Sequence, residues 1–328
     1  MNAKSLEVKI LLAFAAVYFA WGSTYIAIRF AVETIPPFFM GGVRFLIAGG
    51  LLYLYARLRG AAVPQLRQWI PAGIVGALLL LCGNGAVVLA EKTVPSGMVS
   101  LLIAMVPIYF ALVEWIRPGG KAPGLRTSIG LLIGTIGLLL LIGLDKITSA
   151  GAEPLDPRGV VIVMLGSLAW TVGSLYSRSV RIAESPSMAI AMQTLSGGVL
   201  MLLASIGLNE TATVDLSAIT MKSLVSVLYL IVFGSLIGFS AYVWLLKTVR
   251  PALVATYAYV NPVVAVFLGW LLGGEVLNTQ SMIAGAVILS AVWLITGSQE
   301  KPSEPKPAEA EEDTNKTNIE KEPEKASA

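Results

Sequence analysis

The run ILLAFAAVYFAWGSTYIAIRFAV at residues 10–32 decides the class of fold, because it extends for 23 residues with one charged side chain, Arg29. A helix needs about 20 predominantly apolar residues to cross the roughly 30 Å of hydrocarbon in a bilayer. The run also exceeds the apolar region of a cleavable signal peptide in length. It therefore predicts a first membrane-spanning helix.

Nine further apolar runs follow, and together they occupy the chain as far as Gly297. Charged residues make up 13% of the chain, about half the share in a typical soluble domain. We therefore expect an all-α, polytopic membrane protein of ten transmembrane helices with no separate soluble domain. The expected helices cover residues 10–32, 37–56, 69–90, 95–116, 127–145, 159–180, 187–207, 222–246, 251–273 and 279–297.

Basic residues in the loops predict the orientation, since cytoplasmic loops of membrane proteins are rich in Lys and Arg. With the N-terminus inside, the cytoplasmic segments hold 12 of the 23 Lys and Arg residues and the C-terminal tail adds five. The outer segments hold only Lys92, Lys146, Arg158 and Lys222. Both termini are thus expected in the cytoplasm, with the helices in the cell (inner or plasma) membrane.

The C-terminal segment 299–328 differs from the rest of the chain in composition. Its five Lys and nine acidic residues stand among Pro and Ala in low-complexity order. Such a segment has too little apolar surface to bury and is predicted to be disordered. We interpret it as an acidic cytoplasmic tail.

Residue types that common metal and redox sites require are scarce. The chain has no His and a single cysteine, Cys82, so neither a disulfide framework nor a Cys/His metal cluster is expected. No stretch resembles the phosphate-binding loop of ATPases. We therefore expect no catalytic residue, no metal, no cofactor and no nucleic-acid partner.

Two constant offsets relate the halves of the chain. The tripeptide Lys92-Thr93-Val94 recurs as Lys247-Thr248-Val249, 155 positions later. The same offset pairs Gly83 with Gly238, Ala86 with Ala241, Pro107 with Pro262, Trp115 with Trp270, and Gly130 with Gly285. An offset of 149 pairs Trp21 with Trp170, Arg29 with Arg178, and Arg44 with Gln193. These matches indicate a duplication.

The duplication divides the chain into a first repeat at 1–145, a second repeat at 146–298 and the tail at 299–328. Because each repeat holds an odd number of helices, the second must cross the membrane in the opposite sense. Inverted repeats are typical of alternating-access carriers, whose substrate site lies near the bilayer midplane between the repeats.

Three stretches resemble the EamA family of the drug/metabolite transporter superfamily, and within it the YedA-type bacterial permeases. They are AWGSTYIAIRFAVETIPPFFMGGVRF (20–45), GNGAVVLAEKTVPSG (83–97) and YAYVNPVVAVFLGWLLGGE (257–275). The resemblance implies an exporter or permease with both termini inside. It also implies that the first four helices of each repeat surround a central cavity, while the fifth and tenth lie at the periphery.

One departure from the family pattern is visible. The Gly-Glu that commonly closes the fourth helix of each EamA repeat occurs here as Gly274-Glu275, whereas the first half has Pro118-Gly119-Gly120 at the matching place. The role of that Gly-Glu pair is therefore not extended to the first repeat.

Arg44 lies about seven residues, or roughly 10 Å, inside the second expected helix. A cation at that depth is costly unless it is paired or faces water. Its repeat equivalent, Gln193, is also polar in an apolar helix. Arg44 either extends outward or bonds carbonyls of neighbouring helices as a structural support, or else it attracts an anionic group of the substrate or a mobile counter-charge.

Asn84 lies between two glycines in the third expected helix, where a buried amide needs partners and the small neighbours would let a ligand approach. Glu91, two turns later, and Glu114, near the inner end of the fourth helix, are candidate proton-carrying or gating carboxylates. Each could instead form an ion pair at the membrane surface.

Aromatic and polar side chains gather in the first, sixth, eighth and ninth expected helices, and include Tyr242, Trp244, Tyr259 and Asn261. Aromatic side chains in a cavity would suit amphipathic or aromatic solutes, although interface belts and packing are their commoner roles. The candidates for the substrate cavity are Trp21, Ser23, Tyr25, Arg44, Asn84, Trp170, Ser174, Gln193 and Tyr257.

Pro107 and Pro262 occupy equivalent places in the fourth and ninth expected helices. Each removes a backbone donor, so we predict helix kinks there that act either as gate hinges or as fixed bends. The motifs Gly130-x3-Gly134 and Gly234-x3-Gly238 predict close helix packing. Dimerisation through the fifth helix is the alternative, which leaves a monomer or a homodimer.

These features predict a secondary transporter, an exporter or permease, that moves small organic metabolites or drugs across the cell membrane by alternating access. Its partners would be a small organic substrate, with or without a coupled proton, and the membrane lipid. A passive channel or lipid flippase of the same architecture is the alternative. A membrane-embedded enzyme is disfavoured, because no loop offers the closely spaced carboxylates or His residues that bind a metal.

Overall fold

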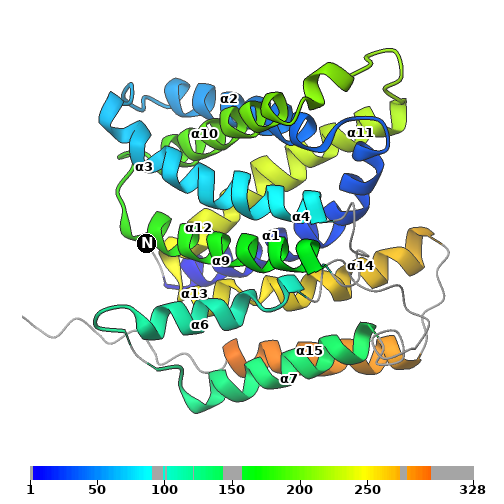
Figure 1. Cartoon of the computed structure of the whole chain (residues 1–328). Helices are drawn as coiled ribbons and strands as arrows, with labels where there is room; N and C mark the ends of the chain where they lie inside the picture. Colours follow the sequence, from blue (N-terminus) through cyan, green and yellow to red (C-terminus); the bar gives the residue numbers. More distant parts are fainter. Residues whose placement is uncertain are drawn as a thin grey trace, which may run out of the picture.

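Apolar helices make up the computed structural model of this chain, which describes residues 3–90, 99, 102–120, 122–142, 157–273 and 279–296 (Figure 1). The described residues form α-helices, two π-helical segments (η1 and η3) and a short 3₁₀-helix (η2), without a β-strand. In chain order the elements are α1 (Ala3–Val32), α2 (Pro37–Leu58), α3 (Leu66–Gly76), η1 (Ala77–Asn84), α4 (Gly85–Ala90), α6 (Val106–Ile116), α7 (Leu125–Ile142), α9 (Pro157–Ser179), α10 (Pro186–Gly207), η2 (Glu210–Thr213), α11 (Met221–Tyr229), η3 (Leu230–Phe239), α12 (Ser240–Thr248), α13 (Pro251–Val254), α14 (Tyr257–Gly273) and α15 (Thr279–Thr296).

Six helical stretches within the described residues are long and apolar enough to cross a membrane. They are Ser5–Val32, Pro37–Leu58, Leu66–Ala90, Pro157–Ser179, Pro186–Gly207 and Met221–Thr248. Shorter apolar helices occupy Val106–Ile116, Leu125–Leu140 and Met282–Ile295. The chain is therefore a multi-pass, all-α membrane protein, as predicted. The count of ten spanning helices and their inverted arrangement remain predictions.

The predicted boundaries agree best with α2, α9 and α10, whose ends fall within about two residues of the expected ranges. α1 differs most, because it begins at Ala3 rather than at residue 10. Of the fourth expected helix, at 95–116, the structure describes Val99 and the residues from 102 onward.

Two pairs of helices pack most extensively, and they lie on opposite sides of the molecule (Figure 1). One pair is α2 with α10, and the other is α7 with α15. Glycines bring α2 and α10 together. A Cβ at Gly42 would lie 2.6 Å from the Leu202 side chain, and one at Gly198 would lie 2.8 Å from the Leu46 backbone nitrogen. Small residues that allow close backbone approach are a general source of helix association in membranes.

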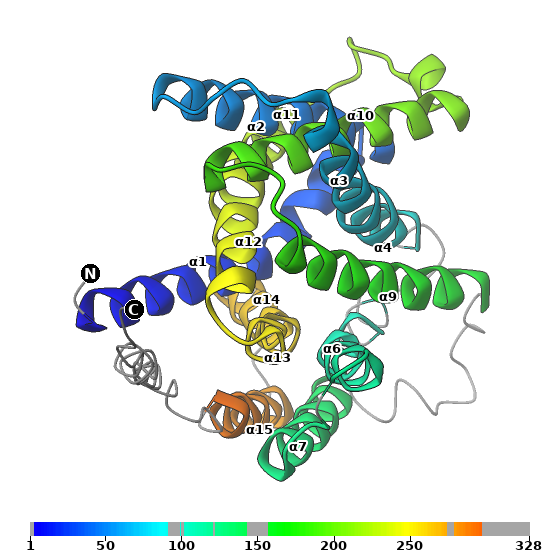
Figure 2. The same cartoon turned by 90° about the vertical axis from the view of Figure 1, so that its left-hand side faces the viewer.

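The remaining contacts between long helices form a reciprocal pattern. α1 packs against η3 and α14, whereas α9 packs against η1 and α6. Figure 2 shows α9 running beside α4 and α6. The first helix of each half of the chain therefore finds its neighbours in the other half.

Two π-helical segments interrupt the third and eighth expected spans. η1 joins α3 to α4, and η3 joins α11 to α12. The offset of 155 carries residues 77–84 onto residues 232–239, which lie within η3. π-Helical turns are rare and frequently occur at functional sites. The apolar pattern of the sequence does not distinguish such turns from α-helix.

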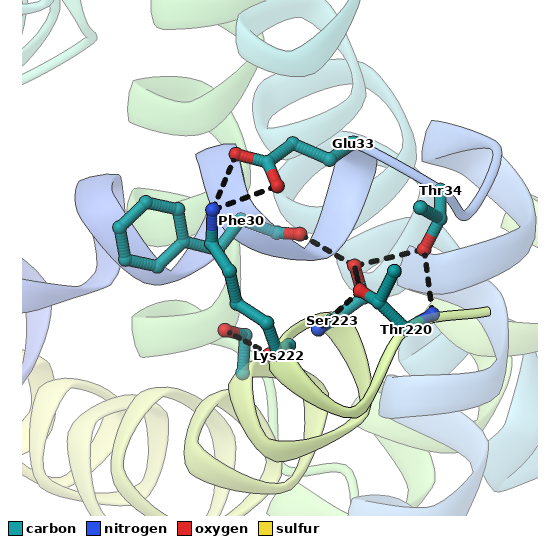
Figure 3. A network of polar contacts seen from close by, with 7 residues as sticks. Phe30, Glu33, Thr34, Thr220, Lys222 and Ser223 are labelled. Atoms are coloured by element: carbon teal, nitrogen blue, oxygen red, sulfur yellow. Dashed lines mark hydrogen bonds and ion pairs between the residues drawn. The ribbon is translucent and has the colours of Figure 1, made fainter.

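A polar cluster joins the C-terminal end of α1 to the N-terminal end of α11 (Figure 3). Lys222 donates to both carboxylate oxygens of Glu33 at 2.8 Å, and its Nζ lies 4.0 Å from the centre of the Phe30 ring. Ser223 is fully buried and donates to the Phe30 carbonyl oxygen at 2.7 Å. Its hydroxyl also accepts a hydrogen bond from Thr34 at 2.8 Å. The cluster holds together two segments that are 189 residues apart in the sequence.

Ser223→Ala is expected to lower the free energy of unfolding by about 1–3 kcal/mol, because it removes a buried donor to Phe30 and a buried acceptor for Thr34. Lys222→Gln removes an ion pair between half-exposed side chains and is expected to cost less than about 1 kcal/mol. Thermal and denaturant unfolding of the purified variants measure both changes. An equal or larger loss for Lys222→Gln would contradict this ranking.

The N-terminus of α2 is capped by a residue from the second half of the chain. Pro36, at the N-cap position, supplies no side-chain cap. Instead, Glu210 Oε2 accepts from the backbone N–H of Phe38 at 2.9 Å and of Phe39 at 3.2 Å. A carboxylate in this place satisfies two helix donors that lack intrahelical partners and complements the helix dipole.

A turn precedes Pro107, and the predicted kink there, as a hinge or a fixed bend, stays a prediction. Ala104 and Met105 form a turn, and α6 begins at Val106. Pro107 therefore stands in the first helical turn, where its missing N–H removes no intrahelical bond. Pro262 lies inside α14, and its role as a hinge or a fixed bend stays a prediction.

Candidate functional site: a central cavity

A cavity lies between helices from both halves of the chain. Its volume is about 100 Å³, which is room for several water molecules or a small solute. Its walls come from α1, α2, η1, α4, the helical residue Ile103, α6, α9, η3 and α14. The lining residues are Trp21, Thr24, Ile28, Arg44, Phe45, Leu80, Gly83, Asn84, Val87, Ile103, Val106, Gly166, Ser167, Trp170, Gly234, Phe239, Tyr257 and Asn261.

Aromatic rings from four helices meet at the cavity. The centre of the Trp21 ring lies 5.6 Å from that of Trp170 and 4.9 Å from that of Tyr257. Tyr242, which is fully buried behind them, contacts all three rings at 4.9–5.6 Å. Trp170 Nε1 donates to the Tyr242 hydroxyl at 2.8 Å, and Trp21 Nε1 donates to the Gly234 carbonyl oxygen at 3.1 Å. The indole N–H groups are thus satisfied, and the rings supply apolar contact surface.

The two cavity tryptophans pack in equivalent ways. A Cβ at Gly83 would lie 2.8 Å from the Trp170 ring, and a Cβ at Gly238 would lie 2.7 Å from the Trp21 ring. The sequence offsets pair these same glycines and these same tryptophans. Each tryptophan therefore rests against a glycine of the other half of the chain.

Arg44 carries the only formal charge among the described lining residues. It is the eighth residue of α2, and only 5% of its surface is exposed. Its Nε donates to the Ser235 hydroxyl at 2.8 Å, and its guanidinium lies 4.6 Å from the centre of the Phe45 ring. Both neighbours are neutral. The ion pairs between described residues involve other side chains, so no described carboxylate neutralises Arg44.

Two asparagine amides add to the polar lining. Asn84 is partly exposed at the end of η1. Asn261 is 2% exposed within α14, and its Oδ1 has no hydrogen-bond partner among the described residues. A buried amide oxygen without a donor costs free energy, which a ligand or a water molecule with a donor group would offset.

Several of the predicted cavity residues line this cavity together, and their contact with a solute stays a prediction. They are Trp21, Arg44, Asn84, Trp170 and Tyr257. The side chain of Tyr25 lies outside the described residues.

Ser23, Ser174 and Gln193 are not among the lining residues of this cavity, and their place in a substrate cavity stays a prediction. The Ser23 hydroxyl bonds with Tyr229 at 2.6 Å, and the Ser174 hydroxyl bonds with that of Tyr242 at 2.6 Å. Gln193 is fully buried in α10, and its Nε2 has no partner among the described residues. The two hydroxyls join neighbouring helices.

One of the two candidate carboxylates can be placed in the structure. Glu114 lies near the C-terminal end of α6, where its carboxylate is 3.8 Å from the Arg117 guanidinium, and it is not a lining residue. Glu91 lies outside the described residues. Proton transfer or gating by either residue stays a prediction.

The lining also contains polar residues that the sequence does not single out. Thr24 and Ser167 lie within long apolar helices. Ser and Thr hydroxyls in such helices commonly bond to the backbone of their own helix, so the sequence gives no reason to single them out. Asn261 carried a signal, because its amide precedes Pro262 in an apolar stretch. Among the described residues, no three His, Cys, Asp or Glu side chains gather to hold a metal ion.

Comparison with known proteins gives matches over nearly the whole chain. The EamA-like transporter family matches residues 8–143 and 157–297. The chain is 39% identical over 289 residues to the uncharacterized inner membrane transporter YedA of Escherichia coli strain K12, which covers 87% of this chain and 89% of that protein. It is 23% identical over 290 residues to the uncharacterized transporter YoaV of Bacillus subtilis strain 168, covering 88% and 97% respectively. A crystal structure with 20% identity has the same fold, with a TM-score of 0.71 over 88% of this chain and 96% of that chain.

Proposed function

The chain belongs to the EamA-like transporter family and is a membrane transporter, and from this premise we propose that it is a secondary transporter that exports a small organic metabolite or drug. The observation that carries the proposal is the cavity, whose wall combines five aromatic rings, two amides and one buried cation from both halves of the chain. Concave, mostly apolar sites with a few polar groups are typical of small-molecule binding.

We further propose that transport proceeds by alternating access of two inverted repeats, at residues 1–145 and 146–298, with 299–328 as a cytoplasmic tail. The reciprocal packing of α1 and α9 supports this arrangement. So do the equivalent π-helical segments and the tryptophans that rest on glycines of the opposite half. In inverted-repeat carriers the halves rock around a site between them.

The proposed location is the inner membrane, with both termini in the cytoplasm. The similarity to an inner membrane transporter supports the location. The excess of Lys and Arg in the expected inner loops supports the orientation. Glu33 and Lys222, and the cluster around them, would then lie at the outer face.

In this proposal Trp21, Arg44, Asn84, Trp170 and Tyr257 contact the solute. Pro262 would act as a gate hinge in α14. Coupling to a proton through Glu91 or Glu114 remains open, and so does the choice between a monomer and a homodimer. Within one chain, Gly130 of α7 already packs against Ile295 and Gly134 against Tyr259, which favours packing over dimerisation at that motif.

Proteoliposomes that hold the purified protein test the function. We expect saturable uptake of at least one class in a panel of amino acids, nucleosides, organic anions and organic cations. We also expect faster uptake when the same solute is preloaded inside, because a carrier must return its site across the membrane. Protein-free liposomes are the control. A flux that rises linearly with concentration and shows no counter-transport would favour a passive channel.

A further inference from the structure

Resting on the proposed transport function, the geometry of the cavity points to its substrate class. We infer that the substrate is a small organic anion with an apolar or aromatic body, and that each transport cycle carries its net negative charge across the membrane. The inference rests on Arg44, on the absence of acidic residues from the described lining, and on Asn261.

Arg44 has donors left for a ligand. A guanidinium has five N–H donors and keeps its charge in proteins. The Nε donor bonds with Ser235, and within the described residues no other hydrogen bond or ion pair involves this side chain. The two terminal nitrogens form a planar fork that matches a carboxylate or phosphate with two parallel hydrogen bonds.

No acidic side chain in the described lining neutralises the positive charge of Arg44. A buried ion without a counter-ion is unfavourable, and the described neighbours of Arg44 are a hydroxyl and an aromatic ring. An anionic ligand would neutralise this charge, whereas a cationic ligand would add to the repulsion. The charge of a solute should therefore affect its affinity for the cavity more than its shape does.

The other lining groups fit the remainder of such a ligand. Trp21, Trp170 and Tyr257 offer ring surface to an apolar or aromatic body. Asn261 offers an amide whose oxygen lacks a donor. A ligand with a hydroxyl or amide N–H beside its anionic group would satisfy that oxygen.

Charge transport follows from the same residues. The described lining holds no Asp or Glu beside Arg44, and Arg44 keeps its charge, so the anion would cross alone rather than with a proton carried by Glu91 or Glu114. An inside-negative membrane potential would therefore drive the anion outward, to a gradient of roughly 50-fold at 100 mV for one charge. The direction of this driving force agrees with export.

Three probes of matched shape test the charge preference: phenylacetate, 2-phenylacetamide and phenethylammonium, with charges of −1, 0 and +1. We expect phenylacetate to bind at least tenfold more tightly than either of the others, measured as the ligand-dependent rise in unfolding temperature of the purified protein.

In proteoliposomes, a potassium gradient with valinomycin sets the potential. With equal phenylacetate on both sides at the start, we expect it to accumulate on the positive side and to flow back when the potential is removed. Tighter or equal binding of phenethylammonium, no stabilisation by any probe, or flux independent of potential would overturn the inference.

Two variants connect the preference to the residue. Arg44→Gln is expected to remove the advantage of phenylacetate over 2-phenylacetamide. Arg181→Gln removes a cation whose side chain is 80% exposed and is expected to leave the advantage intact. Saturable flux of a neutral or cationic solute would refute the charge preference while the transporter function stood. No saturable flux of any solute would refute the function itself.

Discussion

Gly76→Val is expected to prevent the protein from reaching its folded state. A Cβ at Gly76 would lie 2.6 Å from the Gly197 backbone nitrogen and 2.8 Å from the Gln193 carbonyl oxygen of α10. Both obstacles are backbone atoms, so no side-chain rotation can relieve the contact. Forcing α3 away from α10 would also disturb α2, which packs along the same helix. We expect a loss of more than about 3 kcal/mol, which is a large part of a typical folding free energy.

The matched control lies one turn away on the same helix. A Cβ at Gly73 would meet nothing within 4 Å, so Gly73→Val is expected to give near-normal yield and unfolding temperature. The measurements are the yield of monodisperse protein after detergent extraction and its thermal unfolding. Comparable yields for the two variants would show that α3 and α10 do not pack this closely.

Arg44→Ala and Asn84→Ala are expected to reduce transport at low solute concentration by about 10–100-fold without loss of folded protein. The estimate corresponds to the loss of a charge-assisted or a buried hydrogen bond to the solute. Both side chains border a cavity, so water can fill the space that truncation leaves. The measurement is initial uptake rate in proteoliposomes, normalised to the amount of reconstituted protein.

Arg181→Ala serves as the control for this pair, because it removes an exposed cation outside the cavity. Its uptake rate is expected to match that of the unmodified protein. Undiminished transport by both Arg44→Ala and Asn84→Ala would reject the cavity as the transport site. Loss of folded protein for Arg44→Ala alone would favour the structural role of its bond with Ser235.

The sequence predicted the class of fold well for a physical reason. The bilayer demands long apolar segments, so their positions can be read from hydropathy alone. The ranges for α2, α9 and α10 accordingly agree closely with the structure. Internal offsets predicted the pairs Trp21–Trp170 and Gly83–Gly238, which the structure brings into reciprocal contact.

The rotation of each helix about its axis was harder to predict. In a soluble protein an apolar stripe marks the buried face, but a membrane helix is apolar toward both lipid and protein. Gln193 illustrates the difficulty, because its alignment with Arg44 suggests a shared environment. In the structure Arg44 lines the cavity, whereas Gln193 is fully buried in α10 and is not among the lining residues.

The positions of irregular backbone also could not be predicted from the apolar pattern of the sequence. η1 and η3 depend on how neighbouring helices accommodate one extra residue per turn, which apolar composition does not encode. The break before Pro107 is a similar case. Proline forbids a donor at its own position but does not decide whether the helix bends there or starts anew.

The bond between Glu210 and the start of α2 has a consequence for the order of events at the ribosome. Glu210 is synthesised 172 residues after Phe38, an interval of roughly 10–35 s at ordinary rates of translation. Until then, the backbone N–H groups of Phe38 and Phe39 at the N-terminus of α2 must be solvated by water or lipid headgroups. The first half therefore enters the membrane with an open helix end that only a later part of the same nascent chain can close. Biogenesis of this protein is complete only when both halves are present.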